Sequence, residues 1–138
     1  MIESVEAPPE SVITIPNGLP GLPQMERSVL LRPEDLDPIL LLQSLSDASV
    51  SLPVVPARAI SPDYHPTLAP EDRRALGLPE DGPSPELLEL VVLVLDSQEG
   101  VAACNLFAPI LVHPLTRIGR QCLQLGSDYP SLLRLEGL

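Results

Sequence analysis

Proline is the residue that most constrains what this chain can fold into. It occurs 18 times in 138 residues, and many of the prolines bound short apolar runs. A proline has no amide hydrogen, so it cannot donate to the interior of a β-sheet. The runs between the prolines are about as long as β-strands. The sequence therefore predicts a fold of several short strands with turns at regular spacing.

The apolar runs indicate where these strands lie. Two of them, residues 39–45 and 50–55, are joined by a polar Ser-Asp-Ala-Ser turn, which is typical of a hairpin. Pro53 lies inside the second run, so we expect that strand at a sheet edge or with a bulge. Residues 89–95 are apolar on both faces, which predicts a central strand. The other strands are expected at residues 11–15, 28–32, 101–113 and 120–125.

Residues 69–78 are the best helix candidate. Pro70 stands at the first helical position, two acids follow in the first turn, and Gly77 marks the end. Residues 32–38 are expected to form a turn or a single helical turn. For the tail from residue 126 onward we expect a loop, with a short helix as one option.

These elements predict a mainly β fold, which is a small antiparallel β-barrel-like domain or a sandwich with one or two short helices. The length fits one domain over residues 1–138. Aromatic residues make up 2% of the chain, so the core must be built from Leu, Val, Ile and Ala.

The charge restricts the classes of partner. The net charge is −11, and all eight positive side chains are arginines. Such a surface repels phosphate, so we expect no direct binding to nucleic acid, whereas a basic protein partner is weakly favoured. A plain acidic, soluble surface is the alternative interpretation. The start of the chain is acidic and no apolar run approaches the roughly 20 residues that span a bilayer, so we expect a cytoplasmic protein without membrane contact.

The residues that carry chemistry are sparse. His65 and His113 each stand beside a proline, and neither has the spacing of a metal ligand. Cys104 and Cys122 lie in apolar runs, where buried and inert thiols are the usual outcome. The sequence contains no G-x-S-x-G motif and no phosphate-binding glycine loop. We therefore expect no enzymatic activity, no metal and no cofactor.

Polar side chains inside apolar runs are the unusual feature. Gln43 and Ser44 interrupt one strand, Asn105 interrupts another, and Gln121 and Gln124 flank Cys122. A buried amide without a hydrogen-bond partner costs about 1–3 kcal/mol, so these side chains must be satisfied. They either serve bulges and loop backbone within the fold or line an exposed strand edge or groove that binds another chain.

Pro109 and the segment after it suggest a break and a hairpin. Proline cannot donate to a ladder, so position 109 is expected at an edge, a bulge or a loop, with Asn105 serving the unpaired backbone nearby. The turn at residues 116–119 allows a hairpin, with Gly119 free to take positive φ.

Seven short motifs occur together in a recognisable order. They are GLPG at 18–21 after the strand ITIP, LQSL at 42–45, PDY at 62–64, LGL at 76–78, NLFAPI at 105–110, TRIGRQ at 116–121 and SDYP at 127–130. In this order they closely resemble the FliW family of flagellar assembly factors, with a matched core at about residues 12–130. Three positions depart from the family pattern. Leu22 and Pro23 replace a Phe and an acid, and Leu52 stands at or near an aromatic position.

The resemblance implies a non-enzymatic cytoplasmic protein with a β-barrel-like fold. It implies binding to flagellin and to CsrA, an RNA-binding translational regulator that represses flagellin synthesis. When free, this protein would antagonise CsrA. Cytoplasmic flagellin would bind this protein, which would release CsrA and so restore repression. We expect a monomer when the protein is free. The candidate partner-binding or motif residues are Gln43, Ser44, Asp63, Tyr64, Asn105, Leu106, Pro109 and Gln121.

Two other functions stay open from the sequence. One is a small-ligand-binding barrel, which needs a partly empty interior. The other is a generic oligomerisation or protein-interaction module, which needs a symmetric apolar face.

Overall fold

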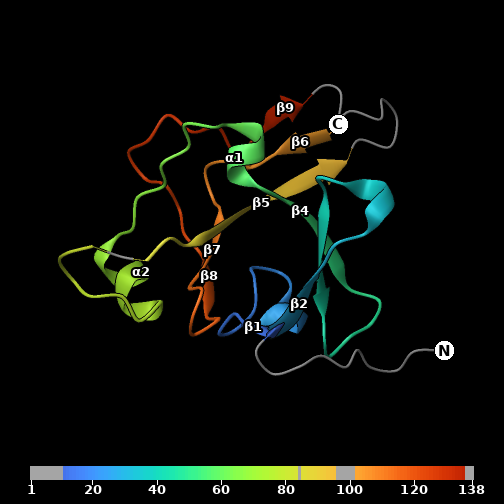
Figure 1. Ribbon diagram of the computed structural model, residues 1–138, viewed down its shortest axis with the longest axis horizontal. Coiled ribbons are helices and arrows are strands. Elements are labelled where there is room, and N and C mark those ends of the chain that lie inside the picture. Colours follow the sequence, from blue (N-terminus) through green and yellow to red (C-terminus); the bar gives the residue numbers. More distant parts are fainter. Residues whose placement is uncertain (1–10, 84, 96–101, 136–138) are drawn as a thin grey trace.

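The computed structural model describes residues 11–83, 85–95 and 102–135. Within them the chain forms one antiparallel sheet and a few short helices (Figure 1). The strands are β1 (Ile13–Thr14), β2 (Arg27–Leu31), β3 (Leu40–Ser44), β4 (Ser51–Pro56), β5 (Leu88–Leu95), β6 (Ala102–Cys104), β7 (Ile110–Val112), β8 (Gly119–Gln121) and β9 (Leu133–Leu135). The helices are α1 (Ala57–Ile60), α2 (Pro70–Ala75) and the 3-10 turns η2 (Pro23–Glu26) and η3 (Glu34–Leu36).

β5 is the strand around which the sheet is organised. The first five strands pair in chain order, and β5 then has two partners on its other side. Its first half pairs with β7, and its second half pairs with β6. The sheet therefore forks, with β8 outside β7 and β9 outside β6. Leu90 of β5 packs in one apolar cluster, and Val91 and Leu93 pack in another, so the middle of the strand is buried on both faces. Val94 and Leu95 at its end are exposed.

The first strand of the main path and the β7–β8 branch meet at one point. Thr14 of β1 forms an isolated parallel bridge with Ile118, and its N–H donates to the carbonyl of Arg117 at 2.9 Å. The sheet thus curls on itself without a continuous closing ladder. This arrangement confirms the predicted mainly β, barrel-like fold.

Three apolar clusters fill the fold. The largest lies inside the curled sheet and includes Ile13, Met25, Leu42, Val54 and Ile110. A second packs Tyr64 and α1 against the outer face of β5 and β6, and a third lies between the end of α2 and the segment around Leu111 and Cys122. As the composition predicted, aliphatic side chains dominate.

Several sequence predictions are confirmed. β3 and β4 form the expected hairpin, and η3 is the expected single helical turn. α2 begins at Pro70, and the chain leaves it through Gly77 at a φ of 73°. β8 pairs with β7 as the expected hairpin strand.

The prediction that Pro53 marks an edge strand or a bulge is wrong, since the ladder with β3 keeps its register through Pro53. β4 lies inside the sheet, between β3 and β5. The ladder with β5 begins only at Val54, so Pro53 is opposite Leu41 of β3 and needs no partner on its other side. A proline is tolerated in an internal strand where one of the two ladders has not yet begun.

Other elements also differ from the sequence predictions. The run 101–113 is two strands, β6 and β7, separated by a loop, and the tail forms β9 rather than a helix. α1 was not predicted. Its four residues follow β4 directly, and tertiary packing of Ala57 rather than a capping signal accounts for it.

Gly119 does not use its freedom to take positive φ. The left-handed residue of the turn is Arg117, at a φ of 61°. The site of Gly119 is crowded, because a Cβ there would lie 3.3 Å from side-chain carbons of Ile13 and Val112, which would have to shift slightly to admit it. Among the described residues, no helix is long and apolar enough to cross a membrane.

Candidate functional site

The loop between β6 and β7 contains three of the candidate residues, and Asn105 shapes it. The Asn105 side-chain oxygen accepts hydrogen bonds from the backbone N–H of Phe107 at 3.0 Å and of Ala108 at 3.1 Å. The side chain therefore takes the place of a backbone acceptor, as Asn does in an Asx turn. The expectation that Asn105 serves the backbone near Pro109 is confirmed.

Pro109 lies where the ladder between β7 and β8 would require a donor. Its carbonyl accepts from the N–H of Cys122 at 2.9 Å, but its own nitrogen cannot return the bond to the carbonyl of Cys122. The side-chain amide of Gln124 donates to that carbonyl at 3.1 Å instead. The interruption by Pro109 and the buried Gln124 are thus two parts of one arrangement.

Gln124 also ties the loop before α2 to this region. Its side-chain oxygen accepts from the N–H of Thr67 at 2.6 Å, and its nitrogen donates to the carbonyl of Thr67 at 2.9 Å. The side chain is fully buried. It acts like one residue of a strand, pairing with both backbone groups of Thr67.

Tyr64 anchors the same loop from the other side. It is fully buried, and its hydroxyl donates to the carbonyl of Leu106 at 2.7 Å. Burial raises the pKa of Tyr64 well above its usual range. Its ring lies 4.6 Å from that of Tyr129, whose hydroxyl accepts from the N–H of His65. Asp63, next to Tyr64, has an exposed side chain.

Gln121 completes this first group. Its side-chain nitrogen donates to the carbonyl of Ala108 at 3.1 Å. The structure therefore brings Tyr64, Asn105, Leu106, Pro109 and Gln121 together around one loop, and buries the side chain of Leu106.

Gln43 and Ser44 form a separate group at the β3–β4 turn. The shortest bonds from the Gln43 side-chain nitrogen go to the carbonyls of Ser44 at 3.0 Å and Val50 at 3.1 Å. The Ser44 hydroxyl donates to the carbonyl of Gln24 at 2.6 Å and accepts from the N–H of Asp47 at 3.1 Å. These side chains hold the turn together and join it to η2.

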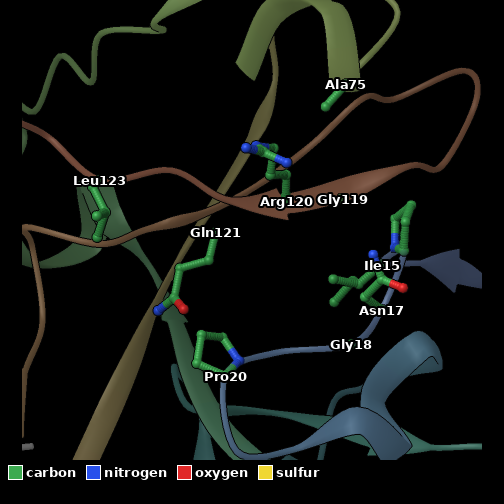
Figure 2. Close-up of a pocket in the computed structure, with 10 residues that line it drawn as sticks. Ile15, Asn17, Gly18, Pro20, Ala75, Gly119, Arg120, Gln121 and Leu123 are labelled. Carbon is green, nitrogen blue, oxygen red and sulfur yellow. The ribbon is translucent and has the colours of Figure 1, made fainter. Parts of the chain in front are cut away.

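A cleft of about 330 Å³ lies beside the first group (Figure 2). One wall is β8 and its continuation to Leu123, and the opposite wall is the loop from Ile15 to Pro20. Figure 2 shows the Gln121 side chain pointing toward Pro20, while Arg120 points to the side of α2. The sequence did not predict this cleft, although residues of two of its motifs, GLPG and TRIGRQ, line the two walls.

Arg120 links β8 to α2. Its Nε donates to a carboxylate oxygen of Asp72 at 2.7 Å, and a terminal nitrogen lies 3.4 Å from a carboxylate oxygen of Glu71. The Asp72 side chain is 7% exposed, whereas that of Arg120 is 38% exposed. The bond to Asp72 raises the pKa of Arg120, so the guanidinium stays charged, and the carboxylates of Asp72 and Glu71 balance its charge beside the cleft.

The cysteines offer no reactive group. Both are free and buried. Burial raises the pKa of the Cys122 thiol to about 12 and also raises that of Cys104. A thiol is nucleophilic as the thiolate, so these two are inert packing at neutral pH. In the part of the chain that the structure describes, no group of three or more His, Cys, Asp or Glu side chains is arranged to hold a metal ion.

The sequence is similar to named proteins along almost its whole length. The sequence model of the FliW protein family matches residues 1–134. The flagellar assembly factor FliW of Thermotoga neapolitana is 33% identical over 126 residues, covering 91% of this chain and 83% of the relative. That of Geotalea uraniireducens is 33% identical over 118 residues, covering 86% and 70%. That of Azoarcus sp. strain BH72 is 32% identical over 133 residues, covering 91% and 89%.

The fold is also that of a solved structure. A crystal structure of the flagellar assembly factor FliW superimposes with a TM-score of 0.82, over 97% of this chain and 92% of the other, at 22% identity. The forked, curled antiparallel sheet is therefore an arrangement that this sequence shares with a protein of that name.

Proposed function

This chain belongs to the FliW family of flagellar assembly factors, and from that premise we propose that it binds flagellin in the cytoplasm and antagonises the translational regulator CsrA. Flagellin and CsrA would then compete for the free protein. Accumulated flagellin would bind this protein and leave CsrA free to repress translation of flagellin mRNA. Secretion of flagellin would release this protein, which would then bind CsrA again. The protein acts by binding and has no catalytic step.

The observation that carries the proposal is family membership across residues 1–134. Two physical features support it. A net charge of −11 favours encounter with a basic regulatory protein and disfavours contact with its RNA. The described surface also exposes large apolar side chains, such as Leu123 at 53% and Leu125 at 76%, which suit protein partners.

The candidate residues contribute to partner binding in two ways under this proposal. Asp63 presents an exposed side chain and is the candidate for direct contact. The other candidates act indirectly, by fixing the shape of the surface that a partner contacts. The loop between β6 and β7 is shaped by Tyr64, Asn105, Leu106 and Pro109. The β3–β4 turn is held by Gln43 and Ser44, and Gln121 bonds to the backbone carbonyl of Ala108.

Calorimetric titration of the purified protein with CsrA from the same source, and separately with its flagellin, tests the proposal. We expect one-site binding at micromolar affinity or tighter to both partners, and mutual exclusion when one is added to a preformed complex with the other. Binding to flagellin alone would reduce the function to a chaperone-like role. Binding to neither would overturn the proposal.

Asp63→Ala provides the matching variant, with Asp128→Ala as its control because Asp128 is another exposed acid in a family motif. We expect Asp63→Ala to lower the affinity for one of the two partners, while the melting temperature stays unchanged. Equal affinities for the two variants would remove Asp63 from the contact surface.

A further inference from the structure

The outer edge of β8 carries backbone groups that the fold leaves unpaired. The N–H of Cys122 donates to the carbonyl of Pro109, and the N–H of His113 donates to the carbonyl of Ile118. In an antiparallel ladder, such hydrogen-bonded pairs alternate with pairs whose backbone groups point away from each other. Gly119 and Gln121 belong to the second kind in their pairing with Val112 and Ile110. The N–H and C=O of Gln121 therefore point outward, away from β7.

This outward edge continues beyond β8. The N–H of Gln124 donates to the carbonyl of Phe107 at 2.8 Å, in the same register as the strand. Leu123 lies between two inward-facing residues, so its backbone groups also point outward. Gly119, Gln121 and Leu123 are the alternate residues of this edge, and all three line the cleft.

Pro16 prevents β1 from covering the edge. The bridge between Thr14 and Ile118 would continue as a parallel ladder if the residue two positions after Thr14 donated to the carbonyl of Gly119. That residue is proline, which has no N–H to donate. The chain instead turns away through Asn17 and Gly18, at φ values of 69° and 73°. The cleft is the gap that opens between the diverging chain and β8.

We propose that this cleft binds an extended segment of a partner protein, which adds to the outer edge of β8 as a further strand. An edge that alternates carbonyl and N–H groups is complemented by the backbone of another polypeptide, and strand addition is a recurring mode of peptide recognition. Within the described residues, no backbone group of the chain bonds to the N–H or C=O of Gln121 on this side.

The charges define the chemistry of the segment. The residues facing the cleft are uncharged apart from Arg120, whose guanidinium is held by Asp72 and Glu71. The part of the segment that enters the cleft is therefore apolar and uncharged. The chain as a whole has a net charge of −11, so it repels an acidic segment and attracts one with basic flanks.

The test begins with a random library of twelve-residue peptides displayed on phage and selected on the full-length protein. Selected peptides are synthesised, and their affinity is measured for the variants Gln121→Pro and Gln121→Ala. Both variants lose the side chain that bonds to Ala108, but only proline also removes the outward N–H. The difference between the two therefore reports the backbone hydrogen bond. Leu123→Pro and Leu123→Ala form a second pair.

We expect selected peptides with apolar centres and Lys or Arg near their ends. Each proline variant should bind them about tenfold more weakly than its alanine counterpart, the effect of losing one hydrogen bond. In the wild-type protein, the amide hydrogens of Gln121 and Leu123 should exchange more slowly once the peptide is bound. The exchange measurement decides the question even where a proline variant does not fold.

Four outcomes would overturn the proposal. The library yields no binder, the peptides bind the proline and alanine variants equally, or they are enriched in acids. Alternatively, sedimentation shows a wild-type dimer that Gln121→Pro converts to a monomer, in which case a second copy of the chain occupies the edge.

Discussion

Individual polar residues hold this fold together where the apolar runs are interrupted, and Asn105 gives the clearest test. Its side-chain oxygen accepts from the N–H groups of Phe107 and Ala108. Asn105→Ala leaves the Ala108 N–H without this acceptor, so the free energy of unfolding should fall by about 1–3 kcal/mol in urea titrations. Asn105→Asp keeps an acceptor oxygen and is the control.

The same variant separates two roles of Asn105. If the residue is structural, folded Asn105→Ala retains its affinity for flagellin and CsrA. Unchanged stability together with a loss of either affinity would instead make Asn105 a contact residue.

The buried thiol of Cys122 predicts a dependence of stability on alkaline pH. Burial raises its pKa in the folded protein from 9.0 to about 12. Above about pH 9 the unfolded chain releases this proton while the folded chain retains it, so the free energy of unfolding falls as the pH rises toward 12. Tyr64 and Cys104, whose pKa values are also raised by burial, act in the same direction.

The variant Cys122→Ala measures how much of this alkaline loss of stability comes from the Cys122 thiol. Urea titrations between pH 8 and 10.5 should show a shallower decline in the variant than in the wild type. Parallel declines would mean that Cys122 does not titrate differently in the two states.

At the scale of elements, α2 depends on contacts outside itself. It has six residues, which is too short for an isolated helix in water. Apolar packing of Leu76 and Leu78 and the pair between Asp72 and Arg120 attach it to the sheet. Asp72→Asn should destabilise the protein by about 1 kcal/mol, a modest amount because Arg120 is partly exposed.

A double-mutant cycle of Asp72→Asn with Arg120→Gln isolates this coupling. Glu71→Gln is the control, since the Glu71 side chain is 71% exposed and its oxygen lies farther from the guanidinium. A coupling indistinguishable from zero would leave α2 attached by apolar packing alone.

The elements that the sequence predicted well are those specified by neighbouring residues. Pro70 and Gly77 mark the ends of α2, and a polar turn marks the β3–β4 hairpin. The errors arose where a distant partner decides the structure. Pro53 is acceptable inside the sheet because β5 begins its pairing one residue later, and the site of Gly119 is crowded because Ile13 lies against it. Neither distant partner is visible in local sequence.

For the candidate site too, the sequence predicted local features but not those that depend on distant residues. The buried amides indicated that Asn105 and Gln124 must find partners, and they do. The cleft was not predictable, because it depends on where Pro16 ends the pairing of a strand with another that lies over a hundred residues away in sequence.

At the scale of the whole molecule, the net charge affects the rate constant for association with a partner. A net charge of −11 attracts a basic protein over a distance of about 10 Å at 0.1 M salt, and over only about 3 Å at 1 M. The association rate constant with CsrA should therefore fall by about tenfold between about 0.05 M and 0.5 M salt in stopped-flow measurements. The dissociation rate constant should change little, since it depends on short-range contacts.

The apolar peptides selected for the cleft provide the comparison within the same protein. Their association should depend less on salt than that of CsrA, because the charge they carry is smaller. If CsrA associates at the same rate at both salt concentrations, the acidic surface serves solubility alone and its partner is recognised by shape and apolar contact. A salt-dependent dissociation rate would place charged pairs inside the interface, where Asp63 and the other exposed acids of the described loops would be the first residues to substitute.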